Sequence, residues 1–217
     1  MIDFLLNFLP EKSNFLNLFS YLTTRTVLST LTGLMMVLFL GNTFIERIRS
    51  LQFQQSIGDR GPDSHKLKDG TPTMGGLLII GSVILSGFLW GDLTNKYLLI
   101  SIFCLFMFGL IGFVDDYNKV KQKNQEGMSG KSKIFWQFIC ACIISVVLYT
   151  TAENKMETSY IVPFFKDVVL DFGIWFIFIS IFIIIGSSNA VNLTDGLDGP
   201  AILPVIIITA ALGIIAW

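Results

Sequence analysis

The sequence predicts an all-α integral membrane protein with about six transmembrane helices. Of its 217 residues, 53% are hydrophobic and only 14% are charged, and the mean hydropathy is +0.67. A soluble domain of this size has too little interior to bury so many apolar side chains. The charges cluster between long uncharged runs, and these runs do not alternate as barrel strands would. Since only helices and closed barrels satisfy their backbone groups in lipid, we expect a single polytopic helical domain over residues 1–217.

Six apolar runs are the expected spans. They cover residues 26–45, 74–90, 97–114, 134–149, 174–186 and 201–217. Trp90, Tyr97 and Trp217 stand near span ends, as expected for an aromatic belt at the membrane surface. Residues 4–19 mix phenylalanine and leucine with polar side chains, which is typical of a segment lying on the membrane rather than crossing it.

The basic residues predict the orientation of the spans. The loop between the first two spans and the loop between the third and fourth hold most of the 15 lysines and arginines. Because basic loops stay in the cytoplasm, these two loops are expected inside and the N-terminus outside. The loop around Asp195 then faces the cytoplasm as well. The formal net charge of −1 gives no bulk attraction for nucleic acid, so no nucleic-acid partner is expected.

Two adjacent carboxylates, Asp115 and Asp116, directly follow the third apolar run. This position predicts acidic side chains at the lipid headgroup boundary. Carboxylate oxygens together with substrate phosphates are what Mg²⁺ prefers, which makes the pair a candidate metal site. The alternative is a solvated helix end that pairs with Lys119. An acidic pair at a helix C-terminus opposes the helix dipole, and this unfavourable placement favours a functional role.

A second polar cluster lies between the last two apolar runs. It contains Asn189, Asn192, Thr194, Asp195 and Asp198, with glycines that allow the backbone to turn. If the segment turns tightly into the last span, its free N–H groups could hold an anion. The alternative is an ordinary turn rich in Asn and Asp.

Three lysines are candidate phosphate partners. Lys68 stands just before a Gly/Thr/Pro-rich turn that opens the second span, and Lys131 and Lys133 stand near the start of the fourth span, where they could contact anionic headgroups or a phosphorylated substrate. The alternative for each lysine is that it has no specific role, because cytoplasmic loops of membrane proteins ordinarily carry an excess of lysine and arginine. The stretch at 127–133 lacks the full spacing of a nucleotide-binding phosphate loop, so nucleotide hydrolysis is not predicted.

Taken together, these motifs resemble the polyprenyl-phosphate N-acetylhexosamine-1-phosphate transferases. The resemblance rests on residues 61–65, 70–76, 112–117, 162–166 and 189–199, in an order and topology compatible with the family. The segments 70–76 and 162–166 are most similar to the branch that uses a muramoyl-pentapeptide donor. The resemblance therefore covers nearly the whole chain.

The resemblance implies Mg²⁺-dependent transfer of phospho-MurNAc-pentapeptide from UDP-MurNAc-pentapeptide to undecaprenyl phosphate at the cytoplasmic face of the bacterial inner membrane. Lipid I and UMP would be the products of this step of peptidoglycan synthesis. By resemblance, Asp115, Asp116 and Asp195 are the catalytic carboxylates, and the first two are candidate metal ligands. The implied substrate-binding residues are Lys68, Thr73, Lys133, Asn189, Asn192 and Asp198. Which carboxylate acts as a base stays open.

Family members are longer, with about ten spans, a further aspartate loop and a C-terminal histidine-rich loop. His65 is the single histidine here, so the chain is expected to match the N-terminal part of such an enzyme, with its N-terminus periplasmic. The alternatives are a related GlcNAc-1-phosphate transferase and an inactive membrane fragment. Besides membrane lipids, a homodimer partner is compatible with the sequence.

Overall fold

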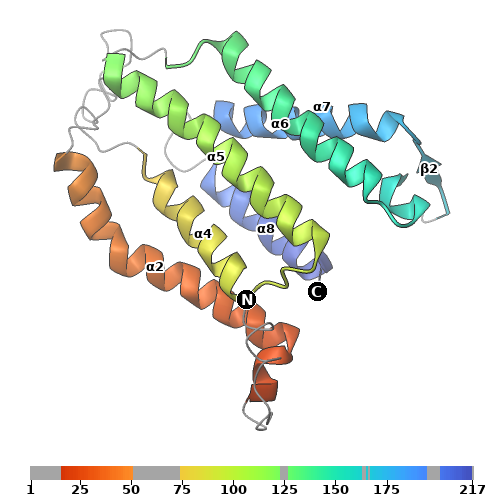
Figure 1. Ribbon diagram of the computed structural model, residues 1–217, viewed down its shortest axis with the longest axis horizontal. Coiled ribbons are helices and arrows are strands. Elements are labelled where there is room, and N and C mark those ends of the chain that lie inside the picture. Colours follow the sequence, from red (N-terminus) through yellow and green to blue (C-terminus); the bar gives the residue numbers. More distant parts are fainter. Residues whose placement is uncertain are drawn as a thin grey trace. The chain divides into compact units, whose positions relative to one another are not determined.

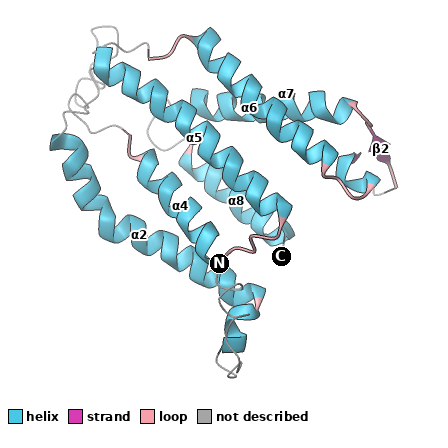
Figure 2. Ribbon diagram, in the orientation of Figure 1, coloured by secondary structure: helices cyan, strands magenta, loops and turns pink. Residues whose placement is uncertain are grey.

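A computed structural model describes residues 16–50, 74–122, 127–162, 165, 167–194 and 201–216. Helices dominate these residues (Figure 2). The α-helices are α2 (Leu22–Ser50), α4 (Gly76–Trp90), α5 (Lys96–Gln122), α6 (Gly130–Thr150), α7 (Trp175–Thr194) and α8 (Ile202–Ala216). The all-α class is confirmed, and each expected span coincides with a helix (Figure 1).

Four of the helices are long and apolar enough to cross a membrane. They are α2, α6, α7 and the Lys96–Lys121 part of α5. Helices α4 and α8 are also apolar, but each has 15 residues, or about 22 Å at the rise of an α-helix. The hydrocarbon core of a bilayer is about 30 Å thick, so these two are short for a complete crossing.

Only short irregular or extended elements accompany the helices in the described part of the chain. A 3-10 turn at Leu16–Ser20 precedes α2, and another at Lys155–Thr158 follows α6. Strands β1 (Ser159–Ile161) and β2 (Val169–Asp171) pair antiparallel with Tyr160 opposite Leu170. This small hairpin lies between α6 and α7. The surface segment expected at 4–19 lies mostly outside the described residues.

The chain divides into two compact units, and each is described by itself. The first is Met1–Trp136 and the second is Gln137–Trp217. In the first unit, α4 packs against both α2 and α5. Small residues allow this close approach, since a Cβ added to Gly87 would lie 3.3 Å from Ile102 of α5.

Two hydrogen bonds tie the C-terminal end of α4 to α2. Arg25 Nε donates to the carbonyl oxygen of Trp90 at 2.7 Å, and Trp90 Nε1 donates to Thr32 Oγ1 at 2.9 Å. The Trp90 ring also stacks on Phe19. A buried indole N–H normally needs such a partner, so these contacts set the register of the two helices.

Candidate functional site

The expected acidic pair lies within α5 rather than at its end. Asp115 and Asp116 follow the apolar run, but the helix continues to Gln122. The placement of the pair at the helix end is therefore wrong, whereas the expected pairing with Lys119 is confirmed. The residues that follow include good helix formers, and Lys119 and Lys121 in the last turn complement the negative end of the helix dipole.

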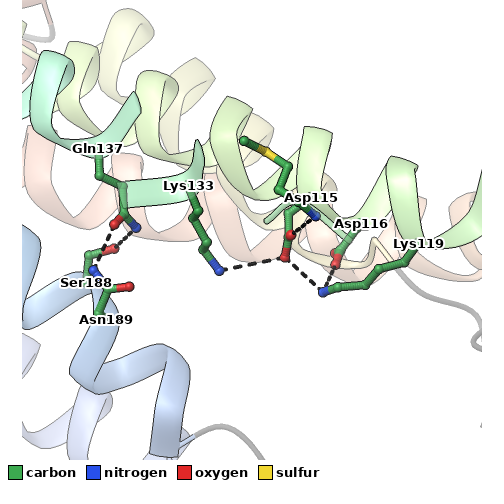
Figure 3. Close-up of polar contacts among 8 residues, drawn as sticks. Asp115, Asp116, Lys119, Lys133, Gln137, Ser188 and Asn189 are labelled. Atoms are coloured by element: carbon green, nitrogen blue, oxygen red, sulfur yellow. Dashed lines mark hydrogen bonds and ion pairs between the residues drawn. The ribbon is translucent and has the colours of Figure 1, made fainter. Parts of the chain in front are cut away.

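Asp115 is a buried carboxylate held by two lysines. Its residue surface is only 7% exposed. Oδ2 lies 2.9 Å from Lys119 Nζ and 3.6 Å from Lys133 Nζ (Figure 3). A buried carboxylate is costly unless it is paired and hydrogen-bonded, and these ammonium groups supply the pairing. In this cluster of Asp115, Lys119 and Lys133, the negative charge of Asp115 is therefore balanced by one lysine on α5 and one lysine on α6.

Lys119 bridges both carboxylates. Its Nζ also lies 3.0 Å from Asp116 Oδ1, with which it shares a hydrogen bond. The geometry follows from helix periodicity, because positions three and four residues apart lie on neighbouring turns of one face. Asp115 and Asp116 are adjacent in sequence and point in different directions, yet both contact the ammonium group of Lys119 one turn further along the helix.

The turn at residues 127–129 closes over Asp115. The backbone N–H of Met128 donates to Asp115 Oδ1 at 2.8 Å. Gly127 has a φ of +55°, which an L-residue rarely adopts, and a Cβ placed there would lie 2.6 Å from Asp115 Oδ1. Both oxygens of Asp115 are therefore engaged, one by the turn and one by the lysines.

Lys133 reaches Asp115 from the first turn of α6. Ser129 caps this turn, because its Oγ accepts from the N–H of Ser132 and its carbonyl oxygen accepts from the N–H of Lys133. The Lys133 side chain is 19% exposed, so its ammonium group is partly removed from water. Asp115 thereby links α5, the turn and the start of α6.

Gly127→Ala is expected to loosen the turn from Asp115. The positive φ costs an alanine about 1–2 kcal/mol, and its Cβ would overlap the carboxylate. We expect a lower thermal unfolding midpoint and faster hydrogen exchange around Met128, measured by mass spectrometry. Gly130→Ala is the matched control, because a Cβ at Gly130 would meet no atom within 4 Å. Equal effects of the two substitutions would contradict the role of Gly127.

By itself, the acidic pair would supply only part of the ligands that a magnesium ion needs. The Lys119 ammonium already lies between the two carboxylates, where a shared metal ion would otherwise bind. Within the residues that the structure describes, no three His, Cys, Asp or Glu side chains gather. Asp116, whose side chain is 36% exposed, is the carboxylate that could hold Mg²⁺ together with substrate phosphate oxygens.

A second polar cluster joins α6 and α7 within the second unit. Asn189 Nδ2 donates at 2.8 Å to both Gln137 Oε1 and the carbonyl oxygen of Ile185. Gln137 Nε2 faces Ser188 Oγ at 3.5 Å (Figure 3). Asn192, by contrast, is exposed near the C-terminal end of α7. Of the two expected asparagines, the structure thus places Asn189 in a hydrogen-bonded cluster.

The other expected site residues lie outside the described residues. They are Lys68, Thr73, Asp195 and Asp198. Sequence reasoning missed Gln137, and it considered the stretch at 127–133 only as a possible phosphate loop, not as a turn that contacts Asp115. Gln137 could have been noticed as a lone amide within an apolar run, and Gly127 as a glycine just before the fourth span.

A buried, lysine-paired carboxylate in a chain of apolar helices marks a candidate functional site of a membrane protein. The family model of glycosyl transferase family 4 matches residues 98–217, more than half of the chain, and the chain belongs to this family. The phospho-N-acetylmuramoyl-pentapeptide-transferase signature 1 matches residues 68–80. The residues matched by the family model include the cluster around Asp115 and the hydrogen-bonded amides of Gln137 and Asn189. The residues matched by the signature include Lys68 and Thr73. The family resemblance seen in the sequence is confirmed.

Proposed function

We propose that the protein transfers phospho-MurNAc-pentapeptide from UDP-MurNAc-pentapeptide to undecaprenyl phosphate, forming lipid I and UMP. The observation that carries the proposal is the buried Asp115 with its two lysines, in a chain of glycosyl transferase family 4 that also carries the muramoyl-pentapeptide signature. Transfer between two phosphorylated substrates requires cationic groups held in fixed positions, and this cluster supplies them. The reaction would take place at the cytoplasmic face of the bacterial inner membrane.

The transfer forms one bond and breaks one. A phosphate oxygen of undecaprenyl phosphate attacks the phosphorus that bears the sugar. The bond from that phosphorus to the bridging oxygen of the diphosphate breaks, and UMP leaves with the electron pair. A phosphate monoester has a second pKa near 6, so the lipid phosphate is mostly dianionic at neutral pH. Its attacking oxygen then needs no strong base, and the carboxylates act mainly by holding cations.

The residues of the cluster have different roles in the proposed transfer. Lys119 and Lys133 neutralise charge on the phosphates, while Asp115 fixes both ammonium groups in place. Asp116 is the more accessible carboxylate and would bind Mg²⁺ with the diphosphate oxygens. Bound Mg²⁺ would stabilise the negative charge on the transferring and leaving phosphates. Asp195, Lys68, Thr73 and the remaining polar residues of the expected site would complete the substrate contacts.

Donor choice tests the proposal. The protein in detergent, supplied with undecaprenyl phosphate and Mg²⁺, is expected to release UMP from UDP-MurNAc-pentapeptide and little from UDP-GlcNAc. Chelating the divalent ion with EDTA should stop UMP release, and added Mg²⁺ should restore it. UMP formation and the lipid product are measured together by chromatography.

The same assay separates the alternatives. Faster turnover of UDP-GlcNAc would make the protein a GlcNAc-1-phosphate transferase. UMP release without a lipid-linked product would indicate hydrolysis and contradict the transfer. No UMP from either donor, in a protein that retains its helical circular dichroism, would overturn the assignment of an enzyme.

A further inference from the structure

The hairpin between α6 and α7 exposes apolar side chains on both of its faces. Tyr160 lies opposite Leu170, and Ile161 lies opposite Val169. Because successive side chains of a strand point to opposite faces, these two pairs lie on different faces of the hairpin. The four side chains are between 40% and 49% exposed. Antiparallel sheets at a protein surface commonly keep one polar face for water, but here apolar pairs occupy both faces.

The hairpin packs against the 3-10 turn Lys155–Thr158 that precedes it. Thr158 of this turn is buried, and Ser159 Oγ donates to the carbonyl oxygen of Lys155 at 2.7 Å. This packing leaves the apolar pairs of the hairpin exposed. A two-stranded hairpin by itself is marginally stable in water, so the hairpin would gain stability from a further apolar contact.

The flanking helices place the hairpin at a membrane surface. Both α6 and α7 are long and apolar enough to cross a membrane, and the hairpin connects them (Figure 1). Asp171 ends β2 and precedes Trp175, the first residue of α7, by four positions. Even a fully extended chain of this length spans only about 14 Å. The hairpin therefore lies close to the level at which α7 enters the membrane.

Exposed apolar side chains continue from the hairpin into α7. Phe165 and Val168 are exposed in the turn of the hairpin, where the N–H of Val168 donates to the carbonyl oxygen of Phe165. Trp175 and Phe178 are exposed in the first turn of α7, and their ring centroids are 5.5 Å apart. Tryptophan is enriched at the level of the lipid headgroups. The hairpin thus extends an apolar surface that is already in the membrane.

Backbone and charge limit how the hairpin can meet the membrane. A two-stranded sheet leaves outer N–H and C=O groups without sheet partners, and such groups are costly in hydrocarbon. The headgroup region, in contrast, still supplies water to them. Residues 151–174 carry four acidic and two basic side chains, a net charge of −2. Anionic lipids would not attract this segment, so apolar contact is the interaction that could hold it at the membrane.

We propose that the hairpin lies in the headgroup region of the bilayer, with apolar side chains of its strands in contact with lipid. In this position it fixes the C-terminal end of α6 and the N-terminal end of α7 at one depth, because short connections join it to both. The partner is the lipid surface itself. The inference does not depend on the proposed reaction.

Fluorescence quenching in lipid vesicles that contain the full chain tests this location. A bimane probe is attached to Tyr160→Cys on one face of the hairpin, or to Val169→Cys on the other. Asn154→Cys is the matched control, because Asn154 is exposed in the same connection and its side chain forms no capping hydrogen bond. Brominated phosphatidylcholine quenches probes in contact with lipid, and iodide quenches probes in water. The unsubstituted protein gives the background from its three cysteines, which lie within α5 and α6.

Brominated lipid is expected to quench the hairpin probes about threefold more strongly than the probe at Asn154, since apolar side chains at a membrane surface reach about 5–10 Å into the boundary between headgroups and acyl chains. Iodide should give the reverse order. Both results should be the same in pure phosphatidylcholine and in vesicles that also contain anionic phosphatidylglycerol. Strong lipid quenching at only one of the two hairpin positions supports the proposal and identifies the face that contacts lipid.

Equal lipid quenching of all three probes would overturn the proposal. So would iodide quenching of both hairpin probes as strong as that at Asn154, which would leave the hairpin in water and available to a protein partner. Lipid quenching that appears only with phosphatidylglycerol would contradict apolar contact as the cause. Helical circular dichroism checks the fold of each variant, and Leu170→Cys replaces Tyr160→Cys on the same face if that protein does not fold.

Discussion

Asp115→Asn is expected to lower transferase turnover at least about 100-fold, a typical effect of removing a group that fixes charge in an active site. Asparagine has nearly the same shape, and its oxygen can still accept from the N–H of Met128. It carries no charge, however, so it no longer holds the ammonium groups of Lys119 and Lys133. The lysines would then move toward water and lose their fixed distance to the substrate phosphates. Turnover is measured as UMP release from UDP-MurNAc-pentapeptide.

Asp92→Asn is the matched control for Asp115→Asn. Asp92 lies in the loop before α5 and accepts hydrogen bonds from the backbone N–H and hydroxyl of Thr94. Its replacement should leave turnover unchanged. Helical circular dichroism and thermal unfolding are recorded for both variants, so that loss of fold is distinguished from loss of chemistry. A folded Asp115→Asn protein with more than half of the normal turnover would contradict the role given to this carboxylate.

Lys133→Met is expected to weaken UMP binding about tenfold or more and to lower turnover further, since hydrogen bonds to charged groups are the stronger ones. Methionine retains the apolar part of the side chain and removes the ammonium group. Because Lys133 is partly buried beside Asp115, its charge is less screened than that of an exposed lysine. Binding is measured by titration calorimetry at low and high salt.

Lys131→Met is the control for charge alone. Lys131 lies on the same helical turn but is exposed, so its removal should change UMP binding only slightly. Lys133→Arg should retain part of the affinity, because it keeps the charge with a different shape. Equal losses in Lys131→Met and Lys133→Met would indicate a general electrostatic effect and contradict a specific contact by Lys133.

The positions of the helices could be predicted because hydropathy is a local property. An uncharged run must form its hydrogen bonds internally in lipid, so the expected spans at 97–114 and 134–149 coincide with α5 and α6. The helix ends could not be predicted from hydropathy alone. The sequence placed Asp115 at the end of the apolar run, but the helix continues to Gln122 because polar residues also form helix.

The site was predictable only in part. Asp115, Asp116 and Lys133 stood out because charged groups next to apolar runs are conspicuous. Their pairing was less evident, since Lys119 was expected only as the partner of a solvated helix end. The contact between Asp115 and Met128 joins residues 13 positions apart, across a turn whose shape depends on a glycine with positive φ. No sequence period predicts such a contact.

By itself, the sequence determined that this is a helical membrane protein of a transferase family and that its charged residues gather between the apolar runs. Hydrophobicity and motif spacing can be read directly from the sequence, so their use requires no knowledge of the fold. Only the tertiary structure decided that Lys133 of α6 lies beside Asp115 of α5 and that Asn189 donates a hydrogen bond to Gln137, 52 residues away. Such pairings depend on which helix faces pack against each other and on which buried amides and charged groups then come within hydrogen-bonding distance.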